Sequence, residues 1–227
     1  MAAPARRLSL RRLRNISNTA QSGESCWRHP VDPPNTAFDQ AAVVFVPMFR
    51  WWNVLPDDER QQWTLDPFVS VGPLRFGTSP GEVSEALSGV TTESRRHTHH
   101  RHATGGVHTV VDGEYREFGL KLYYRQERLA GVVVDALCGP QVFADGMALV
   151  GRAPSTLEQW MVDRADAREP YAELSYMDAG VPGSDTLGVV IDVQRAGDHL
   201  LTRPVFVPAE AMDDLPHFLP GKVWSRC

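Results

Sequence analysis

The chain is poor in the features that would place it at once in a specialised class of protein. Its three cysteines, Cys26, Cys138 and Cys227, are so widely spaced that they exclude a disulfide framework and a cysteine-rich zinc site. No apolar run approaches the roughly 18 residues of a membrane span. The glycine-rich phosphate-binding sequences GxxxxGK[ST] and GxGxxG are also absent.

The composition is that of an ordinary soluble globular protein. Of the 227 residues, 42% are hydrophobic and 22% are charged, which excludes a largely disordered, collagenous or coiled-coil chain. The net charge of -5 argues against general nucleic-acid binding. We therefore expect a cytoplasmic protein that has no cofactor and no membrane or nucleic-acid partner.

The beginning of the chain differs from the rest in its charge. It carries five arginines with no acidic residue among them: Arg6, Arg7, Arg11, Arg12 and Arg14. A secretion signal would continue with an apolar segment, but residues 15–34 are rich in Ser, Asn, Gly and Pro. We interpret residues 1–36 as a disordered basic tail and residues 37–227 as a single domain.

The clearest pattern is an internal match between residues 68–87 and 142–161. Aligned without gaps, two glycines and a proline coincide: Gly72 with Gly146, Gly77 with Gly151 and Pro80 with Pro154. Beyond the prolines, apolar residues at i, i+3 and i+4 also coincide, which indicates one buried helical face in each copy. We predict two related units, at about residues 66–138 and 140–208.

Each unit is predicted to contain a strand, a turn, a helix and further strands. Proline is favoured at the first helical position, so the helices should begin near Pro80 and Pro154. Ser79 and Glu82 form a capping box for the first helix, whereas Ala153 is a poor cap for the second. Strands are predicted at residues 118–125, 129–137, 171–177, 187–194 and 203–207. The result is an α+β fold with a mainly antiparallel sheet and helices on one face.

The segment that begins the first helix resembles a known sequence pattern. Gly72-Pro-Leu-Arg-Phe-Gly-Thr-Ser-Pro-Gly-Glu-Val is similar to a segment of many uncharacterised actinobacterial proteins, some of which are polymorphic-toxin immunity proteins. A similar turn and helix occurs in the BamE-type outer-membrane assembly lipoproteins, whose lipobox cysteine and signal sequence this chain lacks. The matching residues are Gly77, Glu82, Val83 and Leu87, with Gly151 and Leu157 in the second copy. The resemblance implies a small α+β binding domain.

A histidine cluster follows the first predicted helix. Its four imidazoles could ligate a metal ion, and they belong to His97, His99, His100 and His102. Three interleaved arginines oppose a cation: Arg95, Arg96 and Arg101. We interpret residues 88–117 as a mobile polar loop without a metal site, with contact to an acidic partner as a variant. Metal binding by these histidines stays open as an alternative.

Two aromatic clusters are candidate binding surfaces, because Trp, Tyr and Arg dominate interface hot spots. The candidates are Arg50, Trp51 and Trp52 in the first cluster and Tyr123, Tyr124 and Arg125 in the second. A hydrophobic lid over the core is the alternative for the first cluster. In the second, strand alternation puts the two tyrosines on opposite faces, so one of them should point outward.

The sequence indicates binding more than it indicates catalysis. Cys138 precedes a Gly-Pro turn, and we interpret it as a buried structural cysteine. No carboxylate pair has a recognisable catalytic spacing, so we predict no catalytic residue. The leading hypothesis is a non-enzymatic module that binds another protein, with an immunity or antitoxin-like role as its concrete form. An enzyme without a recognisable motif is a further hypothesis.

Overall fold

Two β-sheets and three α-helices form the part of the chain that the computed structural model describes, which is residues 53–89, 94–101, 107–168, 173–177 and 180–224. These residues all belong to one compact unit of the chain. The α+β class predicted from the sequence is therefore confirmed. The predicted basic tail lies outside the described residues.

The elements occur in two similar series. The first is β1 (Gln62–Asp66), β2 (Ser70–Val71), β3 (Leu74–Arg75), α1 (Pro80–Ala86), β4 (Ser94–Arg101), β5 (Val107–Tyr115), β6 (Leu120–Arg125) and β7 (Arg128–Val134). The second is β8 (Gln141–Ala144), β9 (Met147–Ala148), α2 (Pro154–Asp166), β10 (Leu174–Met177), β11 (Val181–Ser184), β12 (Val189–Ala196) and β13 (His199–Phe206). The chain continues through η5 (Ala209–Asp214), α3 (Leu215–Phe218) and η6 (Gly221–Val223), and short 3-10 turns occupy Asp57–Glu59 and Arg116–Phe118.

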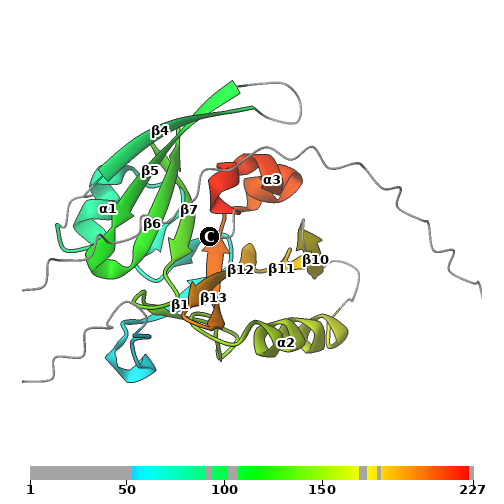
Figure 1. The fold of residues 1–227 in the computed structure, drawn as a ribbon. Helices are drawn as coiled ribbons and strands as arrows, with labels where there is room; N and C mark the ends of the chain where they lie inside the picture. Colours follow the sequence, from blue (N-terminus) through cyan, green and yellow to red (C-terminus); the bar gives the residue numbers. More distant parts are fainter. Residues whose placement is uncertain (1–52, 90–93, 102–106, 169–172, 178–179, 225–227) are drawn as a thin grey trace, which may run out of the picture. The chain divides into compact units, whose positions relative to one another are not determined.

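The larger sheet joins the two series at its centre. It has 8 antiparallel strands in the order β10-β11-β12-β13-β7-β6-β5-β4 (Figure 1). The last strands of the two series, β7 and β13, pair with Val133 opposite Val205. Each series therefore runs outward from the centre in reverse order, which relates the two units by an approximate two-fold axis between β7 and β13.

Equivalent backbone hydrogen bonds recur in the two series. The Gly77 N–H donates to the Leu129 carbonyl at 2.9 Å, and the Gly151 N–H donates to the Thr202 carbonyl at 2.9 Å. Each acceptor residue returns a hydrogen bond to the residue after the glycine, at 2.8 and 2.9 Å respectively. These bonds tie the turn before each helix to the last strand of the same unit.

A second pair of bonds repeats at the opposite end of the same strands. The Asp135 N–H donates to the Gly119 carbonyl at 2.8 Å, and the Val207 N–H donates to the Gly188 carbonyl at 2.9 Å. Both glycines have positive φ, +59° and +63°. Between the two hydrogen-bonded positions, strand β7 has one residue more than β13. The extra residue forms a β-bulge at Ala130, because Tyr123 pairs with Gly131 and the next residue, Tyr124, pairs with Leu129.

The two helices begin where the sequence predicts. Pro80 is the first residue of α1 and Pro154 is the first residue of α2. Ser79 and Glu82 form the predicted capping box, with the Ser79 N–H donating to the Glu82 carboxylate at 2.7 Å. Ala153 provides no side-chain cap for α2.

The ungapped sequence match is one residue out of register at the hairpins. The two-residue turns are 72–73 in the first unit and 145–146 in the second. Gly72 therefore corresponds to Asp145 and not to Gly146. The second turn has positive φ at both residues, +48° and +81°, as in a type I′ turn. The proline after Gly72 cannot adopt positive φ, so the first turn has a different form.

The smaller sheet breaks the symmetry of the two units. Its order is β3-β2-β1-β8-β9, and β1 pairs with β8 in parallel. The sequence pattern does not reveal β1, because residues 55–63 resemble a short helix that the structure limits to one 3-10 turn. Before the first hairpin, only Ser70 and Val71 form a strand, and Phe68 lies in a turn with φ +63°.

Hydrophobic cores cover both faces of the larger sheet. On one face, side chains from β5, β6, β7, β12 and β13 pack with the smaller sheet and with α1 and α2. The apolar part of the other face packs against η5, α3 and η6, through residues such as Leu215, Phe218 and Val223. The two longer helices thus share one face, as predicted, and the short C-terminal helix covers the other.

Candidate functional site

The second predicted aromatic cluster is not an exposed surface. Tyr123 and Tyr124 do lie on opposite faces of β6, but each is only 2% exposed, so the expectation that one points outward is wrong. Tyr124 packs in the core beneath the smaller sheet, and its hydroxyl lies 3.3 Å from that of Tyr115. Tyr123 packs in the core beneath the C-terminal helix. The sequence pattern could not show that the C-terminal helix covers the sheet face that carries Tyr123.

Arg125 is the member of this cluster that reaches a cavity. Its guanidinium lies 4.2 Å from the centre of the Phe218 ring in α3. The two residues line a cavity of about 610 Å³ with Arg128, Glu210 and Asp214. Burial lowers the pKa of Arg125, while the nearby carboxylates of Glu210 and Asp214 oppose that shift. The first predicted cluster, Arg50, Trp51 and Trp52, lies outside the described residues.

The histidine segment is a strand, which corrects the prediction of a mobile loop at residues 88–117. Ser94–Arg101 forms β4 and pairs with β5 over its whole length, from Ser94 opposite Glu114 to Arg101 opposite Val107. β4 is the terminal strand of the larger sheet. The partner strand was missed because Asp112, Gly113 and Glu114 interrupt its apolar pattern.

The structure brings three of the four candidate histidines onto this edge strand. His97 pairs with Val111, His99 with Thr109 and His100 with His108. The structure describes the backbone of these residues but not their side chains, and His102 lies outside the described residues. No group of three potential metal-ligating side chains occurs in the part of the chain whose side chains are described.

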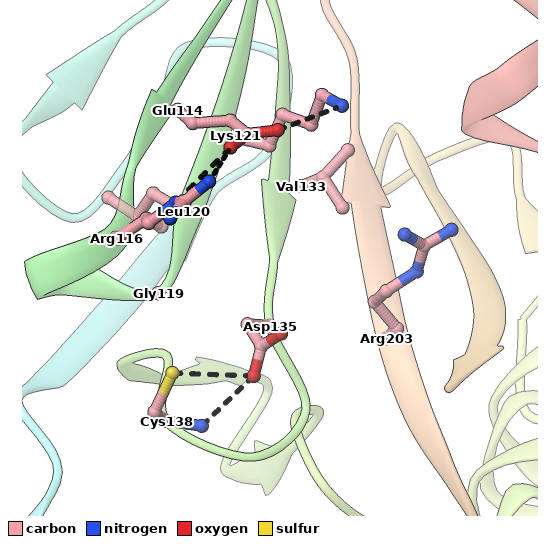
Figure 2. A pocket seen from close by; sticks show the side chains of 9 residues that line it. All are labelled: Glu114, Arg116, Gly119, Leu120, Lys121, Val133, Asp135, Cys138 and Arg203. Carbon is pink, nitrogen blue, oxygen red and sulfur yellow. Dashed lines mark hydrogen bonds and ion pairs between the residues drawn. The ribbon is translucent and has the colours of Figure 1, made fainter. Parts of the chain in front are cut away.

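A charged cavity lies on the same sheet face as the C-terminal core, between strands of both units. Its volume is about 280 Å³. Figure 2 shows the lining side chains around the ends of β6 and β7, with Arg203 approaching from the side of β13: Glu114, Arg116, Gly119, Leu120, Lys121, Val133, Asp135, Cys138 and Arg203. None of these residues except Cys138 was singled out by the sequence.

Strand alternation places these charges together. Asp112 and Glu114 lie two residues apart on β5, and Lys121 on β6 pairs opposite Glu114. The Lys121 ammonium lies 3.5 Å from the Asp112 carboxylate and 3.6 Å from that of Glu114. Lys222 of η6 donates to the other Asp112 oxygen at 2.6 Å. The acidic residues at alternate positions of a strand-like segment were the signal that could have revealed this cluster.

Arg203 connects the cavity to the second unit. It forms an ion pair with Asp192, which lies opposite it on β12 and is 1% exposed. The same guanidinium group donates to the Val223 carbonyl at 2.9 Å. Its Nε atom is buried and has no hydrogen-bond partner among the described residues. A buried donor in this state is uncommon in folded proteins.

Cys138 lies at the opposite wall of the cavity and is exposed, so its interpretation as a buried structural cysteine is wrong. Its Sγ and its N–H both donate to the Asp135 carboxylate, at 3.4 and 3.1 Å. Loss of water around the sulfur raises the pKa of the Cys138 thiol to about 11, and the Asp135 charge adds to the effect. The thiol is therefore protonated at neutral pH, which argues against a nucleophilic role.

Asp135 holds the turn that carries Cys138 in place. One of its oxygens also accepts the Leu137 N–H at 2.8 Å, and the other accepts the Gln194 amide at 2.9 Å. The Arg60 side chain also binds this turn, donating to the Gly139 carbonyl at 2.7 Å and to the Ala136 carbonyl at 2.8 Å. This wall of the cavity is consequently fixed by the fold.

Comparisons with protein-family models, with curated proteins and with solved structures found no match to this chain. The resemblance to immunity proteins therefore stays a prediction. Among the described residues, no helix is both long enough and apolar enough to cross a membrane.

Proposed function

We propose that this protein is a non-enzymatic binding module that recognises an extended acidic segment of another protein along β4. The observation that carries the proposal is the position of β4 at the end of the eight-stranded sheet, where it pairs with β5 on one side. An immunity or antitoxin-like role would be one form of such binding.

The geometry of an edge strand favours an extended partner. A terminal strand presents a row of backbone N–H and C=O groups that a further strand can pair with. β4 is one of the longer strands of the sheet, running from Ser94 to Arg101, whereas the strand at the opposite edge, β10, covers only Leu174–Met177. Main-chain pairing along β4 could therefore hold a segment of similar length.

The charge of β4 favours an acidic partner. The sequence SRRHTHHR contains three arginines and three histidines and no acidic residue, in a chain whose net charge is -5. Pairing of β4 with β4 of a second copy would bring cations opposite one another, which is unfavourable. A segment with alternating carboxylates would instead place opposite charges across the new strand pair.

The test is a binding measurement with a defined probe. A blocked peptide of about ten residues, with glutamate alternating with threonine, is titrated against the full chain by fluorescence anisotropy. We expect saturable binding that weakens as salt is raised, because ions screen the charges. The same peptide with lysine in place of glutamate should not bind.

Matched variants separate edge pairing from general attraction. Replacing Arg95, Arg96 and Arg101 with Gln should weaken binding at least tenfold, about 1.4 kcal/mol. Three exposed arginines outside β4 provide a control with the same change of charge: Arg75, Arg168 and Arg195 to Gln. Equal losses in the two triple variants would contradict the proposal, as would no binding by the unmodified chain. Concentration-dependent dimers that only the β4 variant abolishes would also contradict it.

A further inference from the structure

The charged cavity combines side chains from both units around an apolar floor. Glu114, Lys121 and Asp135 come from the first unit, and Arg203 comes from the second. In Figure 2 the Lys121 ammonium and the Arg203 guanidinium lie on either side of Val133. A volume of about 280 Å³ is at the lower end of small-molecule sites, so it suits a ligand much smaller than a nucleotide.

Two cations of the cavity have hydrogen-bonding capacity that the chain does not use fully. The Arg203 side chain is 23% exposed, and both of its hydrogen bonds, to Asp192 and to the Val223 carbonyl, come from Nη2. Lys121 lies 3.5 and 3.6 Å from its two carboxylates, longer than the ordinary 2.7–2.9 Å or so of a charge-assisted hydrogen bond. A carboxylate placed above Val133 could accept from both groups.

One carboxylate of the cavity is similarly available. The oxygens of Asp135 already accept from Leu137, Cys138 and Gln194. Glu114, by contrast, lies 3.3 Å from Arg116 and 3.6 Å from Lys121, which are loose contacts. Its carboxylate can therefore accept a hydrogen bond from a ligand ammonium group at little loss of existing bonds.

The balance of charge selects among possible ligands. The acids Glu114 and Asp135 and the bases Arg116, Lys121 and Arg203 line the cavity, and their next contacts outward add the acids Asp112 and Asp192 and the base Lys222, which makes four acids and four bases. A simple anion or cation would disturb this balance, whereas a zwitterion would not. We propose that the cavity binds a free α-amino acid, with its carboxylate between Arg203 and Lys121, its ammonium group on Glu114 and its side chain over Val133.

The proposal does not depend on partner binding at β4, and its test uses the full chain with matched ligands. The twenty L-amino acids are titrated by calorimetry, followed by the N-acetyl and carboxamide derivatives of the one that binds most tightly. Each derivative removes one charge with little change of shape. We expect each to bind at least about tenfold more weakly than the parent. An N-acetyl derivative that binds equally well would contradict the role of Glu114. No saturable binding by any amino acid up to about 10 mM would overturn the proposal.

Variants assign each ligand group to its side chain. Glu114→Gln should weaken the amino acid about tenfold and leave the N-acetyl derivative unchanged. Arg203→Lys, which keeps a cation beside Asp192, and Lys121→Gln should weaken every ligand that carries a carboxylate. Lys222→Gln is the control, because Lys222 contacts Asp112 but does not line the cavity. Unfolding midpoints show that each variant is folded, and equal affinities in all four variants would contradict the site.

Discussion

The two units share a backbone frame and differ in almost everything attached to it. In both, a glycine turn before the helix binds the last strand, and a second glycine binds the end of that strand. Helix α1 nevertheless covers only Pro80–Ala86 and has a complete capping box, whereas α2 covers Pro154–Asp166 and has no side-chain cap. The comparison teaches that main-chain hydrogen bonds and glycine positions set the frame, while side-chain function can develop in one unit alone.

The most severe test of this shared frame is to replace its two equivalent glycines. A Cβ at Gly119 would lie 2.6 Å from the Gly139 nitrogen, and one at Gly188 would lie 2.7 Å from the Val207 carbonyl oxygen. Gly119→Ala and Gly188→Ala should each lower the free energy of unfolding by about 3 kcal/mol or more, because overpacking adds to left-handed backbone strain. Urea unfolding measures both values.

Glycines in open turns provide the control for this prediction. Gly77 and Gly146 also have positive φ, +79° and +81°, but a Cβ would meet nothing within 4 Å. Their replacement by alanine should cost only about 1 kcal/mol of strain. If Gly119→Ala is severe while Gly188→Ala is as mild as these controls, the two units do not share the frame described above.

The turn that follows β7 contains a cysteine, Cys138, whose reactivity can be measured, whereas the turn after β13 contains none. With a pKa of about 11 in place of 9.0, the Cys138 thiol forms about 100-fold less thiolate near pH 8, since each unit is a factor of ten. In a chain with Cys26 and Cys227 replaced by Ser, iodoacetamide should therefore react about 100-fold more slowly than with a model thiol. The rate should rise steeply up to about pH 11. Asp135→Asn should accelerate the reaction, and an ordinary rate in the parent chain would contradict the assigned environment.

Substitutions at the two helix N-caps should change the stability by a smaller amount. Ser79→Ala should lower the free energy of unfolding by about 1 kcal/mol because α1 loses its cap. Ala153 has the extended backbone of a cap residue, φ -64° and ψ 129°, so Ala153→Ser should raise the stability by about 0.5–1 kcal/mol. Thermal and urea unfolding measure both changes, and a loss of stability in Ala153→Ser would show that the two starts are not equivalent.

The pH dependence of these two changes should also differ. The Ser79 N–H and, to a smaller extent, the Ser79 hydroxyl hold the pKa of Glu82 below its ordinary value of 4.5, and Ser79→Ala removes only the hydroxyl. A lowered acid pKa gives stability that is present above the unfolded-state value and is lost as pH falls through the folded-state value. The effect of Ser79→Ala should therefore shrink in acid, while that of Ala153→Ser should stay constant from pH 7 to about pH 3. Parallel urea titrations at several pH values provide the measurement.

The sequence pattern was sufficient for the helix starts and for strands β6 and β7, because each depends on local signals. Glycine and proline mark the turns before Pro80 and Pro154, and Gln126 and Glu127 form the turn at the tip of the hairpin, with φ +49° and +58°. These features require no knowledge of distant contacts. The α+β class followed from their order along the chain.

The site was much less predictable, because it depends on which strands become neighbours. Lys121 and Arg203 are far apart in the sequence and reach one cavity only because β7 pairs with β13. The burial of Tyr123 likewise depends on a C-terminal segment that covers its face of the sheet. Strand β4 was taken for a loop because its polar sequence has no apolar alternation, which an edge strand does not need.

The most direct test of the proposed binding compares the two edges of the larger sheet by amide hydrogen exchange. Alternate amides of an edge strand lack a partner within the sheet and exchange rapidly. When the acidic peptide is added at saturation, we predict that the rapidly exchanging amides of Ser94–Arg101 become protected, while those of Leu174–Met177 do not change. Protection at both edges, or an unchanged β4 in the presence of bound peptide, would contradict the account.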